Sequence, residues 1–174
     1  MKIFITGSQG SGKSHLIRAL KERGYVAYNI DHTEGAAQLE KDGRPTEWPE
    51  GVIDWNVYHW NMQRPVINEL LASAETVFIA GLPGNWREFL NDFDKIVVLT
   101  VTPETQLHRL QTRNVHQYGQ SDEELHRRVA SHDKNVRRFL EAGAVAINSE
   151  QSVEKIIQEI LLTSNQRSRY HAET

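Results

Sequence analysis

The segment from Gly7 to Ser14 has the residue types and the spacing of a phosphate-binding loop. It reads Gly7-Ser8-Gln9-Gly10-Ser11-Gly12-Lys13-Ser14 and matches the pattern G-x-x-x-x-G-K-[ST]. Its glycines lack a Cβ and readily adopt positive φ angles, so the backbone can fold closely around a phosphate. Successive backbone N–H groups and the start of the following helix then present partial positive charge to that phosphate.

The last residues of this loop supply the charges that phosphoryl transfer requires. We expect Lys13 to bridge the β- and γ-phosphates of ATP and the Ser14 hydroxyl to ligate Mg²⁺. His15 follows at the start of the helix and is expected to touch a phosphate. The alternative is an ordinary Gly/Ser-rich turn. The position of the loop between an apolar strand (3–5) and an amphipathic helix favours phosphate binding.

Short apolar runs alternate with helical patterns along the chain, which predicts an α/β domain with a mainly parallel sheet and helices on both faces. Strands are expected at residues 3–5, 25–28, 76–80, 96–101 and 144–147. Helices are expected around residues 16–20, 66–71 and 153–161, and from Pro103 onward with Thr102 as N-cap. One domain is therefore expected over residues 1–162, followed by a polar tail at 163–174.

The composition excludes several classes of function. The 174 residues include no cysteine, which excludes disulfides, thiolate catalysis and cysteine zinc sites. The net charge of -3 provides no overall positive field, so no nucleic-acid partner is expected. No apolar run approaches the length of a membrane span, and the eight histidines show no metal-ligand spacing. We expect a cytoplasmic enzyme or ATPase that does not contact membranes.

The loop and the order of elements around it resemble the nucleoside and nucleotide kinase group of P-loop proteins, which includes adenylate kinase-like and shikimate kinase-like enzymes. The resemblance extends to about Ile160. It implies a three-layer P-loop NTPase fold, in which a five-stranded parallel sheet in the order 2-3-1-4-5 carries helices on both faces and a short lid. It also implies ATP and Mg²⁺ as cofactors, and a small-molecule phosphoryl acceptor.

Two arginines four residues apart, Arg109 and Arg113, lead into a polar stretch after the fourth expected strand. This spacing puts both guanidinium groups on one helix face. In adenylate kinase-like enzymes such a pair begins the lid, which here would span about 113–122. The resemblance implies that Arg109 stacks on the adenine and that Arg113 contacts the transferred phosphate. A solvated helix face is the alternative. Arg137 or Arg138 is a further candidate for a phosphate contact.

The segment Asn29-Ile30-Asp31 follows the second expected strand, where shikimate kinases read Asp-x-Asp. The resemblance implies that Asp31 meets the acceptor hydroxyl and accepts its proton. Asn29 departs from the pattern, at the position that helps to hold Mg²⁺ through water in that family. The alternative, weighted equally, is that Asp31 caps a helix beginning near Thr33.

The third expected strand ends at Ala80-Gly81 without a Walker B aspartate. Large mechanical ATPases and switch GTPases usually carry an acidic residue there, so the sequence argues against a motor. Shikimate-type kinases instead place glycines against the acceptor, and the resemblance implies that Gly81 lies at the acceptor site. No guanine-specific N-K-x-D motif is present, which favours ATP over GTP.

Residues 32–62 form an insertion that has little apolar periodicity and contains three of the four tryptophans. Acceptor sites and lids usually lie in such insertions. Trp55 and Arg64 are the predicted acceptor contacts, because aromatic and guanidinium groups together bind a base and an anion. Arg87 is a further candidate for an anionic group. The alternative is that the tryptophans pack the insertion against the sheet. A turn is expected at 42–45.

The leading hypothesis is a kinase that moves the γ-phosphoryl group of ATP to a nucleoside or nucleotide. A shikimate/gluconate-type kinase of a non-nucleotide hydroxyl compound is the nearest rival, favoured by Asp31 and Gly81. A regulatory ATPase that hydrolyses ATP slowly or not at all is the third hypothesis. It is favoured by the missing Walker B acid and the incomplete Asp-x-Asp pattern. The sequence leaves the acceptor and the oligomeric state open.

Overall fold

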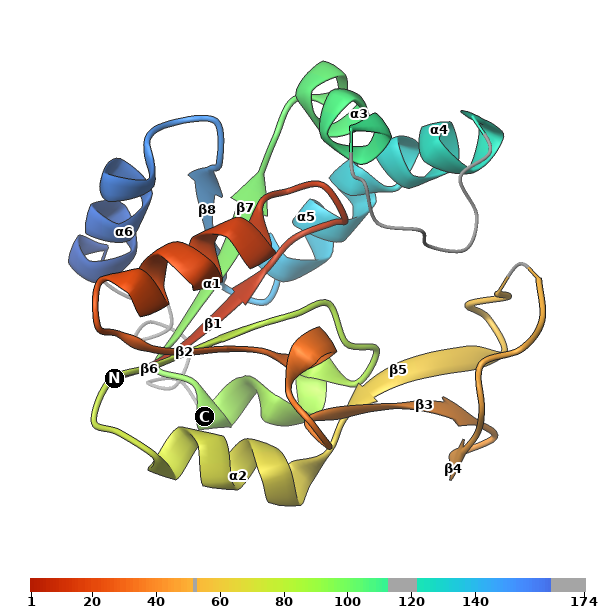
Figure 1. Ribbon diagram of the computed structural model, residues 1–174, viewed down its shortest axis with the longest axis horizontal. Helices are drawn as coiled ribbons and strands as arrows, with labels where there is room; N and C mark the ends of the chain where they lie inside the picture. The colour runs from red at the N-terminus through yellow and green to blue at the C-terminus, as the bar shows by residue number, and fades with distance from the viewer. Residues whose placement is uncertain (52, 113–121, 164–174) are drawn as a thin grey trace.

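The computed structural model describes residues 1–51, 53–112 and 122–163 (Figure 1). Its strands are β1 Lys2–Thr6, β2 Val26–Asn29, β3 Ala37–Lys41, β4 Arg44–Pro45, β5 Tyr58–Met62, β6 Val77–Ala80, β7 Lys95–Thr100 and β8 Val145–Asn148. Its α-helices are α1 Lys13–Glu22, α2 Arg64–Ala72, α3 Pro103–Gln111, α4 Asp122–Ala130, α5 His132–Leu140 and α6 Val153–Leu162, and two 3₁₀ helices are η1 Ile30–His32 and η2 Trp86–Asp92. None of the helices in this part of the chain is long and apolar enough to cross a membrane.

A five-stranded parallel sheet forms the centre of the molecule, in the order β2-β6-β1-β7-β8. When its strands are numbered along the chain, this is the predicted order 2-3-1-4-5. The register pairs Ile5 of β1 with Ala80 of β6 and with Val97 of β7. The carboxyl ends of the strands therefore meet at one edge of the sheet, which is where parallel sheets position ligands.

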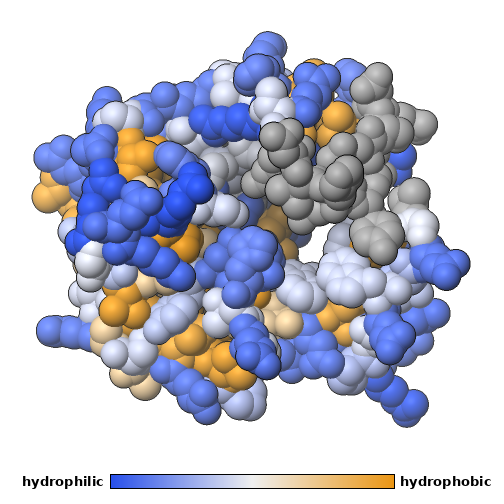
Figure 2. All heavy atoms as spheres, in the orientation of Figure 1, coloured by the Kyte–Doolittle hydropathy of each residue, from blue (hydrophilic) through white to orange (hydrophobic). Residues whose placement is uncertain are grey.

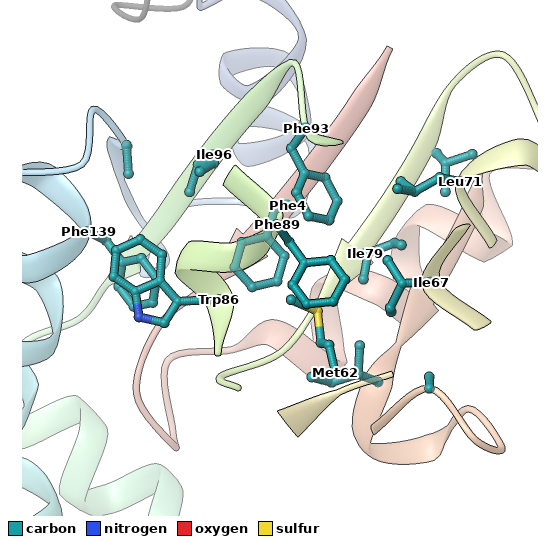
Figure 3. Close-up of a cluster of buried hydrophobic side chains, with 14 of the residues drawn as sticks. Phe4, Met62, Ile67, Leu71, Ile79, Trp86, Phe89, Phe93, Ile96 and Phe139 are labelled. Atoms are coloured by element: carbon teal, nitrogen blue, oxygen red, sulfur yellow. The ribbon is translucent and has the colours of Figure 1, made fainter. Parts of the chain in front are cut away.

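Helices cover both faces of this sheet, as predicted, because its central strands are buried on both sides. Alternate residues of β1 point to opposite faces. Ile3 and Ile5 pack with α1 and α6, whereas Phe4 packs with α2, η2 and α5. Figure 3 shows the second of these cores, in which Trp86 and Phe139 lie against each other beside Phe4 and Phe89. The sheet thus separates an α1/α6 side from an α2/α5 side.

The helix that follows β7 begins as the sequence predicts. Thr102 is its N-cap, with its side-chain oxygen accepting from the backbone N–H of Thr105, and Pro103 occupies its first turn. The predicted strands and helices agree with those observed to within a few residues. The predicted lid at 113–122 and the tail at 163–174 lie outside the described residues, apart from Asp122 and Thr163, so these boundaries stay predictions.

The insertion contains a feature that the sequence did not reveal, a small antiparallel sheet in the order β4-β3-β5. It extends away from the main sheet in Figure 1. The turn predicted at 42–45 is confirmed in its first half, where Asp42 has φ 52° and Gly43 has φ 71°. Arg44 and Pro45 belong to β4 instead. Apolar residues do alternate with polar ones in β3 and β5, where Ala37 and Leu39 pair with Met62 and Trp60 on one face. Each of these strands has only five residues, so the alternation is too short to stand out in the sequence.

Candidate active site

The loop between β1 and α1 has the backbone conformation that its glycines predict. Gly7, Gly10 and Gly12 have φ angles of 145°, 81° and 97°, which residues with a side chain rarely adopt. A Cβ on Gly7 would also lie 2.6 Å from the Ser11 hydroxyl oxygen and 2.9 Å from the Leu99 carbonyl oxygen. The loop is therefore curled too tightly for any other residue at this position.

Lys13 is folded back across the loop and is only 9% exposed. Its ammonium group donates to the carbonyl oxygens of Gly7 and Ser8, the latter at 3.1 Å. Within the described part of the chain, the buried Ser11 hydroxyl makes no hydrogen bond. A cation held at the mouth of a glycine-rich loop, beside a buried hydroxyl without a partner, fits a phosphate group.

A continuous series of hydrogen bonds connects this loop to the insertion. The Asn29 amide donates to the Ser14 hydroxyl at 3.1 Å, and the Asn29 amide oxygen accepts from the Asp31 backbone N–H at 3.0 Å. The Trp60 indole N–H in β5 then donates to the Asp31 carboxylate at 3.0 Å. We call Ser14, Asn29, Asp31 and Trp60 the polar chain. It brings the predicted metal ligand and the predicted base into one network.

The alternative role of Asp31, as the cap of a helix beginning near Thr33, is wrong. The short helix at this place is η1, which begins at Ile30, three residues before Thr33, and ends at His32. Its N-cap is Asn29, because the amide oxygen of Asn29 accepts from the backbone N–H of Asp31, the second residue of η1. The Asp31 side chain is thus released from capping, and its Oδ1 is bound by Trp60.

A pocket of about 450 Å³ adjoins the loop on the α1/α6 side of the sheet. Its lining includes Gly10, Gly12, His15 and Arg109, together with the segment Ser149–Gln151 after β8. Arg109 is fixed there, because its guanidinium donates to the Ser149 hydroxyl and carbonyl oxygens, both at 3.1 Å. The structure therefore brings two predicted nucleotide contacts, His15 and Arg109, to one pocket of the size of ordinary ligand sites.

Three side chains outside the predicted motif also hold the loop. Asn135 in α5 donates to the Ser8 hydroxyl at 3.2 Å, and Gln106 in α3 donates to the Gln9 carbonyl oxygen at 2.7 Å. Arg128 in α4 donates to the Gln9 amide oxygen. Sequence reasoning missed these residues, because single polar residues on amphipathic helices carry no signal that separates them from solvated positions.

The structure places the predicted acceptor contacts in three different settings. Arg64 donates to the Asp92 carboxylate at 2.5 Å and to the Glu88 carbonyl oxygen at 2.7 Å, so it anchors α2 to η2. A Cβ on Gly81 would lie 2.3 Å from Ile30 Cδ1, so packing against η1 is sufficient to require a glycine there. Trp55 is 52% exposed in the insertion.

Of the other predicted site residues, some lie near the glycine-rich loop, and one lies outside the part of the chain that the structure describes. Asp31 and Ser14 are joined through Asn29, whereas Arg113, the predicted contact of the transferred phosphate, lies outside the described residues. Of the two candidate arginines in α5, Arg137 is exposed, whereas Arg138 is half-buried against Trp86. The sequence alone did not distinguish these two.

A buried histidine lies on the α2/α5 side of the loop. His132, the first residue of α5, is 5% exposed, and its Nδ1 has no hydrogen-bond partner among the described residues. Burial lowers the pKa of His132 from its ordinary value of 6.5, and the positive charge of Lys13 lowers it further, against the opposing effect of Asp133. The folded protein therefore favours the neutral imidazole.

This lowered pKa predicts that the fold loses stability as the pH falls. The unfolded chain binds a proton at His132 near pH 6.5, whereas the folded chain resists it. The stabilisation is therefore complete above pH 6.5 and declines below it. Urea unfolding of the wild type and of His132→Gln from pH 7.5 to 5.5 measures the difference. Below pH 6.5, the free energy of unfolding of the wild type should fall by up to about 1.4 kcal/mol per pH unit more than that of His132→Gln. The same pH dependence of the unfolding free energy in both proteins would contradict the prediction.

The chain matches the sequence profile of the AAA_18 family of AAA domains over residues 3–142. Dephospho-CoA kinase of Streptococcus mutans serotype c is 27% identical over 172 residues, covering 74% of this chain and 79% of its own. Shikimate kinase from Acinetobacter baumannii in complex with shikimate has a TM-score of 0.53 and 24% identity, covering 92% of each chain. Deoxyadenosine kinase from M. mycoides with bound dATP has a TM-score of 0.51 and 15% identity, covering 92% of this chain and 97% of its own. Both solved structures share the fold of this chain.

Proposed function

Because the chain belongs to the AAA_18 family of AAA domains, we propose that it binds ATP on the glycine-rich loop and transfers the γ-phosphoryl group to a small-molecule acceptor. The observation that carries this proposal is the polar chain, which connects Ser14 of the loop to Asp31 and to the insertion. The similarity to dephospho-CoA, shikimate and deoxyadenosine kinases supports the same activity.

On the nucleotide side, the loop would hold the phosphates and the pocket would hold the adenosine. Lys13 exchanges its two carbonyl contacts for phosphate oxygens, and Arg109 lies at the pocket wall where a purine would stack. The Ser14 hydroxyl is the metal ligand, and Asn29 orients it by donating a hydrogen bond. Mg²⁺, when bound, neutralises negative charge on the phosphates. Asn29 thus takes a positioning role in place of the acidic residue that shikimate kinases carry.

On the acceptor side, Asp31 is the proposed base. A hydroxyl oxygen of the acceptor forms a new bond to the γ-phosphorus, the bond from that phosphorus to the bridging oxygen breaks, and ADP leaves. The proton of the hydroxyl passes to the Asp31 carboxylate. Trp60 holds this carboxylate through Oδ1, so Oδ2 would accept from the acceptor hydroxyl.

We favour a nucleoside or nucleotide as the acceptor because the insertion displays aromatic surface beside Asp31. Trp48 and Trp60 lie with ring centroids 5.5 Å apart and tilted by 38°, and Trp48 is 52% exposed. Such rings offer a face on which a base stacks. Figure 2 shows an opening in the surface beside the insertion. A non-nucleotide hydroxyl compound remains the rival acceptor, since Asp31 serves either class.

The test is ADP release from Mg-ATP in the presence of pooled acceptors: nucleosides, nucleoside monophosphates, and sugars with hydroxy acids. We expect one pool to stimulate release well above the acceptor-free rate. The same pool should have no effect on Lys13→Ala. A rate that no pool changes would reject the kinase proposal and favour the regulatory ATPase.

A further inference from the structure

Two arginines from different elements converge on one buried tryptophan. The Arg87 guanidinium carbon lies 4.5 Å from the Trp86 ring centroid, and that of Arg138 lies 6.0 Å from it. Arg138 also lies 5.0 Å from the Phe139 ring centroid. Trp86 is 2% exposed and begins η2, whereas Arg138 is on α5. We call Arg87, Trp86 and Arg138 the arginine cluster.

Within residues 1–51, 53–112 and 122–163, the positive charges of this cluster have no carboxylate counter-ion. Neither guanidinium has a carboxylate partner among the described residues, and the buried Nε–H of Arg138 makes no hydrogen bond there. Burial, and then the charge of Arg87, lower the pKa of Arg138. The contrast is Arg64, whose guanidinium carbon lies 3.9 Å from the Phe89 ring centroid but is neutralised by Asp92 at 2.5 Å.

Two neighbouring cations without a counter-ion are unfavourable, and a half-buried guanidinium with an unpaired donor is costly. An oxyanion that accepted hydrogen bonds from both arginines would remove both penalties at once. Arg64, a comparable stacked arginine, is neutralised by the protein's own Asp92 carboxylate. The arginine cluster therefore has the chemistry of an anion site.

The position of the cluster relates it to the acceptor and not to the nucleotide. Asn135 donates to Ser8 of the loop, and Arg138 follows it by about one helical turn on α5. On the other element, Asn85 binds both the N–H and the carbonyl oxygen of Met62 at the end of β5. The cluster thus lies between the loop and the insertion, on the α2/α5 side, whereas the nucleotide pocket is on the α1/α6 side.

We propose that the arginine cluster binds an oxyanion, a phosphate or a carboxylate, carried by the phosphoryl acceptor. This inference rests on the proposed kinase function and narrows it, because it makes the acceptor an anionic molecule. An uncharged nucleoside or sugar would leave both guanidinium groups without a counter-ion. A nucleoside monophosphate satisfies both the exposed tryptophans and the arginines, whereas a hydroxy acid satisfies the arginines alone.

The binding test uses inorganic phosphate as the probe and requires no turnover. Thermal unfolding at low ionic strength is followed with increasing phosphate for the wild type, Arg138→Gln and Arg137→Gln. The glycine-rich loop binds phosphate in all three proteins, so their difference isolates the cluster. Arg137→Gln removes one charge from an exposed neighbouring position. We expect it to match the wild type, whereas Arg138→Gln should gain less stability from phosphate. Equal gains in all three proteins would overturn the proposal.

The kinetic test distinguishes whether the acceptor carries a phosphate or a carboxylate. Turnover is compared between uncharged nucleosides and polyols, nucleoside 5′-monophosphates, and hydroxy acids. We expect turnover with one anionic pool, which identifies the group as phosphate or carboxylate. Arg138→Gln should raise the KM for that acceptor about tenfold to a hundredfold with an unchanged KM for ATP. Turnover with uncharged acceptors alone would overturn the proposal. If no pool is turned over, the kinase proposal fails and the phosphate titration still decides whether the cluster binds anions.

Discussion

Lys13→Ala is expected to abolish phosphoryl transfer, with a loss of at least about 1,000-fold in the rate of acceptor-dependent ADP release. The ammonium group is buried at 9% exposure and already lies against the carbonyl oxygens of the loop. Arg109 and Arg128 also contact the loop, at the Gly10 carbonyl oxygen and the Gln9 amide oxygen, but Lys13 is the cation that belongs to the loop motif itself. Alanine therefore removes the charge that would stabilise the oxygens between the β- and γ-phosphorus atoms.

Initial rates at saturating ATP and acceptor measure this effect, and unfolding by heat shows whether the fold persists. Lys21→Ala, an exposed lysine on the same helix, is the matched control and should retain the wild-type rate. Near wild-type turnover in Lys13→Ala would contradict the assignment of the glycine-rich loop as the phosphate site. If Lys21→Ala lost its activity as well, the cause would be damage to helix α1 and not the loss of the Lys13 charge.

Asp31→Asn is expected to remove turnover while leaving the affinity for ATP unchanged. Asparagine has the same shape, and its amide oxygen still accepts from the Trp60 indole, so the polar chain stays intact. What disappears is the negative charge that takes the acceptor's proton, and general-base catalysis contributes about 100- to 10,000-fold. The catalytic rate constant should fall by that factor.

Steady-state kinetics and equilibrium binding of ATP together test this expectation. Asp54→Asn is the control, because Asp54 is an exposed acid of the same insertion and its carboxylate accepts only from Asn56 among the described residues. Retained turnover in Asp31→Asn would mean that Asp31 serves to anchor Trp60 and is not the base. A loss of ATP affinity would instead place Asp31 on the nucleotide side.

The fold was predictable because its signals are local and strong. Buried parallel strands read as apolar runs, and the glycine-rich loop fixes where the first of them ends. The proposed nucleotide contacts within residues 7–14 could be named directly from that loop. The antiparallel sheet of the insertion was not predicted, because β3 and β5 alternate apolar and polar residues over only five positions each and are held by pairing with each other.

The acceptor half of the site was only partly predictable, because its contacts join segments far apart in the chain. The sequence singled out Asp31 as a candidate, but the hydrogen bond that Trp60 donates to it spans 29 positions and depends on strand β5, which was not predicted. Arg64 has the residue type of an anion contact, yet Asp92 neutralises it. Arg138 was indistinguishable from Arg137 until the packing of Trp86 against Phe139 showed which one is half-buried.

The polar chain also has a thermodynamic consequence. It runs without a gap from the hydroxyl at the nucleotide end to the indole at the acceptor end. A ligand that orders one end reduces the conformational entropy that a ligand at the other end must still overcome. We therefore expect positive cooperativity between the two substrates. By thermodynamic linkage, bound nucleotide and bound acceptor must raise each other's binding affinity by the same factor.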